Sequence, residues 1–145
     1  MKKEKRLHIL LVDDDAVDRE LFIDALNPSE KNCLVSEAAD GQEALDFLGA
    51  QSLPDLIILD LNMPVKDGRQ TLKELKAHPV YKTIPVCILS TSSAQFDVLN
   101  AYDSGANLFL VKPHDYRELT EMLQNLLTLF GKYTALAAPA SHNAL

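Results

Sequence analysis

The chain has 145 residues, of which 47 % are hydrophobic and 24 % are charged, the balance of one globular domain rather than of a disordered or fibrous chain. Its formal net charge of −7 disfavours direct nucleic-acid binding, and no apolar run is long enough to cross a membrane. Because the start of the chain has no signal-peptide pattern, we expect a cytoplasmic domain at 7–131, with a basic arm at 1–6 and a flexible tail at 132–145.

Five short apolar runs alternate with segments of helical periodicity, a pattern typical of an α/β fold with a parallel sheet covered on both faces. The predicted strands are 8–12, 33–38, 56–59, 86–89 and 108–111. The second strand contains Ser36 and Glu37, so it suits an edge of the sheet better than its centre.

Two segments have clear helical faces that we expect to pack on the sheet. The first face is Val17, Leu21 and Ala25, and the last is Leu119, Met122, Leu123, Leu126, Leu127 and Phe130. Turn residues lie where elements should stop, at Asn27-Pro28, Asp40-Gly41, Asp67-Gly68, His78-Pro79, Gly105 and Gly131. Asp40 is the expected N-cap of the helix that follows it.

Right-handed crossovers leave few topologies, and we adopt the doubly wound, flavodoxin-like strand order 2-1-3-4-5 as a hypothesis. This order makes the first and third strands neighbours, and ligands are expected in the crevice beyond their carboxyl ends. Asp13, Asp14 and Asp15 follow the first strand, and Asp60 follows the third. Because carboxylates so close together repel one another, the cluster should raise a pKa or bind a hard cation such as Mg²⁺ or Ca²⁺.

The fourth and fifth strands add Ser90 and Lys112 to the same edge. A hydroxyl and an ammonium group opposite carboxylates favour a further anion, such as a phosphoryl group. Each residue also has a structural alternative, since Ser90 could satisfy backbone groups and Lys112 could form an ion pair. Asp14 or Asp15 could likewise only cap the first helix. Their shared position at the ends of strands favours the functional interpretation.

These residues resemble the receiver domains of two-component response regulators, which are CheY-like proteins, from Leu7 to about Phe130. The segment 60–68 is similar to the phosphorylation loop of that family. The other matching positions are the acidic pair Asp13 and Asp14, the hydroxyl residue Ser90 and the Lys-Pro pair Lys112-Pro113. Ser90 replaces the commoner Thr, and Thr91 is bulkier than the usual residue, so both could slow phosphoryl access.

The resemblance implies a site with Asp60 as the phosphoacceptor and Mg²⁺ as the cofactor. Asp14, Asp60 and the main-chain carbonyl of Asn62 would bind the metal directly, and Asp13 would act largely through water. Ser90 and Lys112 would hold the phosphoryl oxygens. A cis peptide bond before Pro113 is also implied.

A sensor histidine kinase or a phosphotransfer protein would then be the phosphodonor, with no enzymatic turnover beyond self-phosphorylation and slow autodephosphorylation. Ser90 and Phe109 would form the switch, although Phe109 could equally be a core residue. The face made by the fourth helix, the fifth strand and the fifth helix would carry the signal to a downstream protein. The same face is a candidate homodimer interface.

Three other classes of protein share parts of this pattern. A haloacid dehalogenase-type phosphatase would need a second Asp where Asn62 stands, and it would need a substrate cap. A flavodoxin-like FMN carrier would need a Ser-, Thr- and Gly-rich loop in place of the three aspartates. A receiver-fold adaptor that works without phosphorylation remains the alternative, and Mg²⁺ titration would separate it from a phosphoacceptor.

Overall fold

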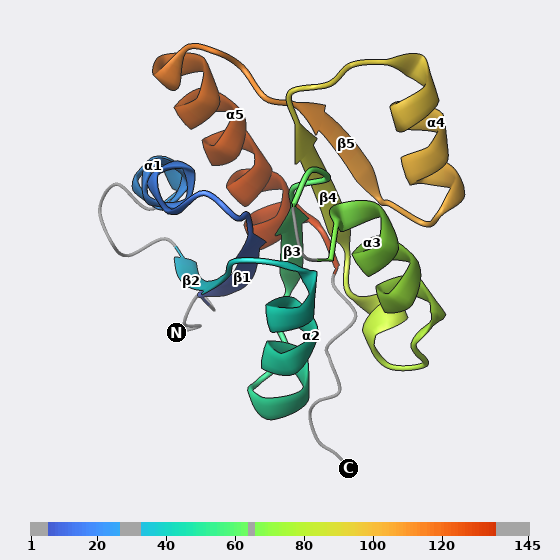
Figure 1. Ribbon diagram of the computed structural model, residues 1–145. Helices are drawn as coiled ribbons and strands as arrows, with labels where there is room; N and C mark the ends of the chain where they lie inside the picture. Colours follow the sequence, from blue (N-terminus) through green and yellow to red (C-terminus); the bar gives the residue numbers. More distant parts are fainter. Residues whose placement is uncertain (1–5, 27–32, 64–65, 136–145) are drawn as a thin grey trace.

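Strands and helices alternate along the chain (Figure 1), and the computed structural model describes residues 6–26, 33–63 and 66–135. The strands are β1 (Leu7–Val12), β2 (Cys33–Ala38), β3 (Leu56–Leu59), β4 (Val86–Ser90) and β5 (Leu108–Val111). The helices are α1 (Ala16–Leu26), α2 (Gly41–Ala50), α3 (Gly68–Ala77), α4 (Gln95–Asp103) and α5 (Tyr116–Thr128). A 3₁₀ turn, η1 (Tyr81–Thr83), follows α3, and a π-helical turn, η2 (Leu129–Tyr133), follows α5.

The strands form one parallel sheet in the order β2-β1-β3-β4-β5. This confirms the predicted fold class, the predicted strand order and the edge position of β2. The register pairs Val12 with Leu59 and Leu59 with Ile88, so β1 and β3 end at the same level and β4 continues two residues further, to Ser90. The strand predictions are right to within one residue, since β1 starts at Leu7 and β4 ends at Ser90.

Each face of the sheet is covered by its own set of helices (Figure 1). Helices α1 and α5 pack on one face, where Ile9, Ile58 and Leu123 belong to one buried cluster. Helices α2, α3 and α4 cover the other face with a second cluster that includes Leu10 and Leu72. Because both faces are covered, the central strands consist mostly of Ile, Leu and Val rather than of alternating polar and apolar residues.

Helix α1 differs from the sequence prediction in the face that it buries. Val17 is 64 % exposed and Leu21 is 43 % exposed, whereas Phe22, Ala25 and Leu26 are buried. The first turns of α1 lie at the carboxyl edge of the sheet, because the helix starts directly after β1, and only its second half packs deeply on the strands. For α5 the prediction is confirmed, with Leu119, Leu123, Leu126 and Leu127 buried.

Most predicted element ends are confirmed. The Asp40 carboxylate accepts the Glu43 N–H at 2.9 Å as the N-cap of α2, and the Asp67 carboxylate caps α3 in the same way. Gly105 follows α4 with a φ of 105°, which a side chain would disfavour. The predicted stop at Gly131 is wrong, because the helical path continues through it to Tyr133.

Several predicted features lie outside the described residues. These are the Asn27-Pro28 turn, residues 1–5 of the basic arm and residues 136–145 of the tail. Among the helices that the structure describes, none is both long enough and apolar enough to span a bilayer.

Candidate functional site

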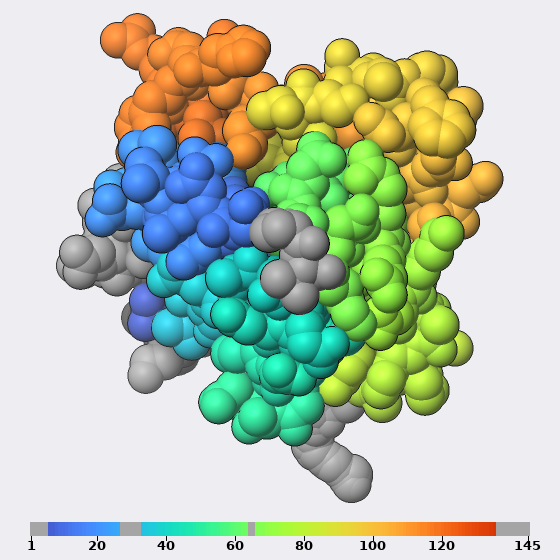
Figure 2. Space-filling model, in the orientation of Figure 1, coloured from blue at the N-terminus to red at the C-terminus, as the bar shows by residue number. Residues whose placement is uncertain are grey.

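Polar residues follow four neighbouring strands at one edge of the sheet. Val12 of β1 leads into Asp13 and Leu59 of β3 leads into Asp60, while β4 ends at Ser90 itself. Lys112 follows β5. Figure 2 shows the segments after these strands, coloured blue, green, yellow and orange, gathered on one face of the molecule. The topology therefore brings together residues that are up to 99 positions apart in the sequence, as residues 13 and 112 are.

Three carboxylates form the centre of this edge. Asp13, Asp14 and Asp60 each place an oxygen within 4.8 Å of the others. Asp13 is only 1 % exposed, Asp60 is half-buried and Asp14 is exposed. The Oδ2 atom of Asp13 is buried and accepts no hydrogen bond from the residues that the structure describes. A buried oxygen without a donor suits a cation among the three carboxylates, which would replace its lost hydration.

The main chain positions two of these acids. The N–H groups of Asp13 and Asp60 donate to the carbonyls of Ala38 (3.1 Å) and Val12 (3.0 Å), which continues the ladder past the strand ends. The Asp13 carboxylate accepts the Asp15 N–H at 2.9 Å, and the Asp60 carboxylate accepts the Asn62 N–H at 3.2 Å. Backbone donors therefore fix one oxygen of each acid and leave the other available.

The two positioned acids have perturbed protonation equilibria. Burial raises the pKa of Asp13 to about 6, and the negative charge of Asp60 adds to this effect against the opposing Asp15 N–H. Burial also raises the pKa of Asp60, while the Asn62 N–H and the positive charge of Lys112 oppose the rise. Both carboxylates are thus costly to keep ionised without a cation.

Asp15 is not part of the carboxylate centre. Its side chain accepts the N–H groups of Val17 (2.9 Å) and Asp18 (3.3 Å), so it caps the start of α1. The structural alternative that the sequence left open for Asp14 or Asp15 therefore applies to Asp15.

Ser90 and Lys112 stand at the carboxyl ends of β4 and β5, at the same edge of the sheet as the acids. Ser90 is 1 % exposed, and its hydroxyl oxygen accepts the Ser92 N–H at 3.1 Å. The Lys112 N–H donates to the Ser90 carbonyl at 2.7 Å, which holds the two strand ends together. The ammonium group of Lys112 lies 3.5 Å from the Asp18 carboxylate and 4.9 Å from the centre of the Phe22 ring.

Asp18 and Arg19 are neighbours of the site that sequence reasoning missed. Asp18 pairs with Lys112, and the Arg19 guanidinium donates to the Asp13 carbonyl at 2.6 Å and to Glu37 at 2.9 Å. Both residues lie in the first turns of α1. Because α1 starts directly after the three aspartates, the sequence could have indicated that its first residues lie next to the site.

The other two predicted site residues are Asn62, which follows β3, and Phe109, which lies on β5. Asn62 is exposed, and its N–H contacts Asp60 as described above. Phe109 is half-buried on β5 and packs against the cluster beneath α2, α3 and α4. Its N–H donates to the hydroxyl of Tyr102 on α4 at 3.0 Å. The prediction of a cis bond before Pro113 is wrong, since the described residues contain no cis peptide bond.

Comparison with known proteins gives one consistent family. The response regulator receiver domain family matches residues 9–124. The response regulator Rcp1 of Synechocystis sp. (strain ATCC 27184 / PCC 6803 / Kazusa) is 36 % identical over 136 residues, which cover 90 % of this chain and 92 % of Rcp1.

Two solved structures are similar over nearly the whole described fold. The phosphorylated cyanobacterial phytochrome response regulator RcpA is 35 % identical with a TM-score of 0.85, and the match covers 91 % of this chain and 99 % of RcpA. The Mn²⁺-bound form of Rcp1 is 36 % identical with a TM-score of 0.82, again over 91 % of this chain and 99 % of the other.

Proposed function

The chain belongs to the response regulator receiver family, and we propose that Asp60 is the residue on which it accepts a phosphoryl group. As a receiver domain it is a signalling protein of the two-component class. The observation that carries the assignment of Asp60 is the cluster of carboxylates with Ser90 and Lys112 at the adjoining strand ends. We propose 7–131 as the extent of the domain.

The cofactor in this proposal is Mg²⁺. Its ligands are the carboxylates of Asp14 and Asp60 and the main-chain carbonyl of Asn62, with Asp13 acting largely through water. An all-oxygen donor set is the one that hard divalent cations prefer, and the unpartnered Oδ2 of Asp13 supports a cation here. When bound, the metal supplies positive charge opposite the oxygens of the phosphoryl group.

In the transfer step, a carboxylate oxygen of Asp60 attacks the phosphorus of a phosphohistidine. The new O–P bond forms as the N–P bond breaks, and the imidazole nitrogen keeps the bonding electron pair. Lys112 contributes a positive charge and Ser90 a hydroxyl donor to the transferred oxygens. To reach them, Lys112 exchanges its pairing with Asp18 for the new anion.

The phosphodonor in this proposal is a sensor histidine kinase or a phosphotransfer protein, acting in the cytoplasm. The apolar side chains of Val17 and Leu21 on α1 are available for such a partner beside the site. A cavity of about 320 Å³, lined in part by Leu21, Lys112 and Tyr116, continues this surface. Since RcpA is a phytochrome response regulator, a kinase of the phytochrome class is the first donor to test.

The output surface in this proposal is the face of α4, β5 and α5. Large apolar side chains are exposed there, namely Phe96, Leu99, Tyr102, Val111 and Tyr116. This face suits a downstream protein target or a second copy of the chain, because an exposed apolar patch favours association. The Phe109 N–H donates to the hydroxyl of Tyr102 on this face, and the Phe109 side chain packs against the core, which supports a role for Phe109 with Ser90 in the switch.

The test is the intact mass of the protein after incubation with acetyl phosphate and Mg²⁺. We expect a single phosphoryl adduct on the wild type, none on Asp60→Asn, and none when EDTA removes the metal. We expect no continuing turnover of an external substrate. A site that hydrolyses its phosphoryl group rapidly would show no adduct but would still bind beryllofluoride. If the folded wild type neither gains an adduct nor binds beryllofluoride, the protein is a phosphorylation-independent adaptor instead.

A further inference from the structure

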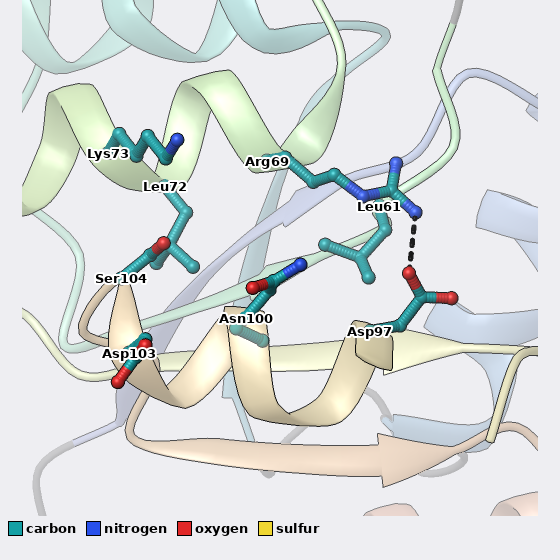
Figure 3. A pocket seen from close by; sticks show the side chains of 9 residues that line it. Leu61, Arg69, Leu72, Lys73, Asp97, Asn100, Asp103 and Ser104 are labelled. Atoms are coloured by element: carbon teal, nitrogen blue, oxygen red, sulfur yellow. Dashed lines mark hydrogen bonds and ion pairs between the residues drawn. The ribbon is translucent and has the colours of Figure 1, made fainter. Parts of the chain in front are cut away.

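A chain of polar contacts links helix α3 to the loop between β4 and α4, and Figure 3 shows the first of these contacts, between Arg69 and Asp97. Arg69, in the first turn of α3, donates from Nη2 to Oδ1 of Asp97 at 3.3 Å. The hydroxyl of Ser92 donates to Oδ2 of the same carboxylate at 2.7 Å. Asp97 therefore uses both oxygens to connect two segments that are 23 residues apart, as residues 69 and 92 are. We call this set the Arg69–Asp97–Ser92 bridge.

Both ends of the bridge touch the phosphorylation site. At one end, the Ser92 N–H donates to the hydroxyl oxygen of Ser90 at 3.1 Å. At the other end, Gly68 precedes Arg69 and donates its N–H to the Leu61 carbonyl at 2.9 Å. A Cβ atom on Gly68 would collide with the Asp60 carbonyl oxygen, so the start of α3 lies directly against the main chain of Asp60.

Apart from this bridge, the described residues make few contacts that hold the start of α4. Its N-cap residue, Ala94, has no capping side chain, and the Ala94 N–H donates to the Ser92 hydroxyl oxygen at 3.2 Å instead. Ala101 is the single buried residue of α4. A cavity of about 300 Å³ lies between α3 and α4, lined by residues that include Leu61, Leu72 and Asn100 (Figure 3). The loop and the first turn of α4 therefore have room to move once the polar contacts break.

We infer that Arg69 and Asp97 are positioning residues, which hold Ser92 and thereby retain Ser90 in the position that it takes without a phosphoryl group. This inference rests on the proposed function, since Ser90 is expected to move toward the phosphoryl group on Asp60. That movement breaks or lengthens the hydrogen bond from the Ser92 N–H to the Ser90 hydroxyl oxygen. It also displaces Ser92, whose hydroxyl donates to Asp97. The bridge thus opposes the phosphorylated state, and its loss favours that state.

The test is calorimetric titration of beryllofluoride, a mimic of the phosphoryl group, into the full chain with Mg²⁺ present. Arg69→Gln and Asp97→Asn each remove one charge of the bridge. We expect each variant to bind beryllofluoride about three- to fivefold more tightly than the wild type. This is the change in affinity that corresponds to the loss of one partly exposed ion pair. Arg69→Lys keeps the charge and should stay within about twofold of the wild type.

Lys73→Gln is the matched control for Arg69→Gln. Lys73 lines the same cavity one turn further along α3, and its replacement by Gln also removes one positive charge. It should leave the affinity for beryllofluoride unchanged. The affinity for Mg²⁺ alone should be the same in all variants, since general damage to the site would change it as well.

The possible outcomes separate this inference from the proposed function. If the wild type does not bind beryllofluoride, the proposed function fails. If the wild type binds it but the two bridge variants bind equally well or more weakly, the bridge does not oppose the phosphorylated state and the inference is wrong. Arg69 is a partly exposed side chain, so loss of its charge is not expected to prevent folding.

Discussion

Asp13 carries the largest electrostatic cost among the residues of the site. Its side chain is almost fully buried beside Asp60, and its pKa is raised to about 6. The folded chain therefore holds the proton of Asp13 more tightly than the unfolded chain does. As pH rises from about 4 to about 6, the unfolded chain loses this proton first, so the metal-free protein loses stability over that range.

Replacing Asp13 by Asn should relieve this cost. In EDTA at pH 7.5, we expect Asp13→Asn to raise the free energy of unfolding by about 1–3 kcal/mol, since one unit of pKa is worth about 1.4 kcal/mol. The gain should shrink toward pH 4, where the folded wild type keeps the proton of Asp13 and the unfolded chain is about half protonated at this residue. Urea unfolding of both proteins at the two pH values measures this difference.

Asp14→Asn is the comparison, because Asp14 belongs to the same cluster but is exposed. It should change the metal-free stability much less than Asp13→Asn. A gain from Asp13→Asn that is equal at pH 4 and pH 7.5 would show that burial of charge is not its cause.

At this scale, the strand ends predicted every acid of the cluster and the family resemblance gave Asp13 and Asp14 different roles, but the sequence left open whether Asp14 or Asp15 only caps the first helix. Three consecutive aspartates look alike in a sequence, whereas the chain direction after β1 buries Asp13, exposes Asp14 and turns Asp15 onto the start of α1. The pairing of Lys112 with Asp18 was likewise not predictable, because it depends on how α1 lies beside the end of β5.

Helix α3 starts directly against the main chain of the loop that follows β3. Gly68, its first residue, leaves no space for a Cβ atom, which would meet the Asp60 carbonyl oxygen and lie 2.6 Å from the Cα atom of Leu61. Gly49, near the end of α2, has open space around the same position. The two glycines therefore offer a test of how tightly α3 and the loop are joined.

Gly68→Ala should destabilise the protein by about 1–3 kcal/mol, because the added methyl group forces α3 away from the main chain of Asp60. It should also slow phosphorylation by acetyl phosphate, since Asp60 would shift. Gly49→Ala should instead stabilise the protein by about 0.5–1 kcal/mol, as alanine favours the helix. Thermal unfolding and the rate of mass gain measure both effects, and equal stability of the two variants would contradict this account of the contact.

Helix α1 is the element on which the periodicity argument failed. Spacing alone placed Val17 and Leu21 with Ala25 on a buried face, because a helical pattern does not reveal how far a helix extends beyond its sheet. The buried stripe begins at Phe22, and the two exposed residues lie at the edge that carries the site. Where a pattern of burial fails next to a site, a binding surface is a reasonable explanation.

For the molecule as a whole, alternation of apolar runs and helical segments was enough to predict a parallel sheet covered on both faces. The strand order was a hypothesis chosen among the few right-handed topologies, and the structure confirms it together with the edge that gathers the polar residues. The arrangement of the bridge between α3 and α4 was not predictable, because Arg69, Ser92 and Asp97 are ordinary polar residues until the fold brings them together.

The exposed face of α4, β5 and α5 leads to a prediction about assembly. With beryllofluoride and Mg²⁺, we expect sedimentation velocity to show a larger fraction of dimer than without them. Val111→Asp should weaken that dimer by about tenfold or more, because it places a charge within the exposed apolar patch of this face. Val80→Asp changes an equally exposed valine on another part of the surface and should leave the dimer intact.

One face of the sheet is closed by the first and the last of the α-helices, and this has a consequence for biosynthesis. Leu7, Ile9 and Phe22 leave the ribosome early, yet the helix that covers them, Tyr116–Thr128, is made about a hundred residues later. Until then this apolar surface stays open to solvent. Nascent chains that stop before residue 116 should therefore bind chaperones, whereas chains that include residue 128 should become resistant to protease.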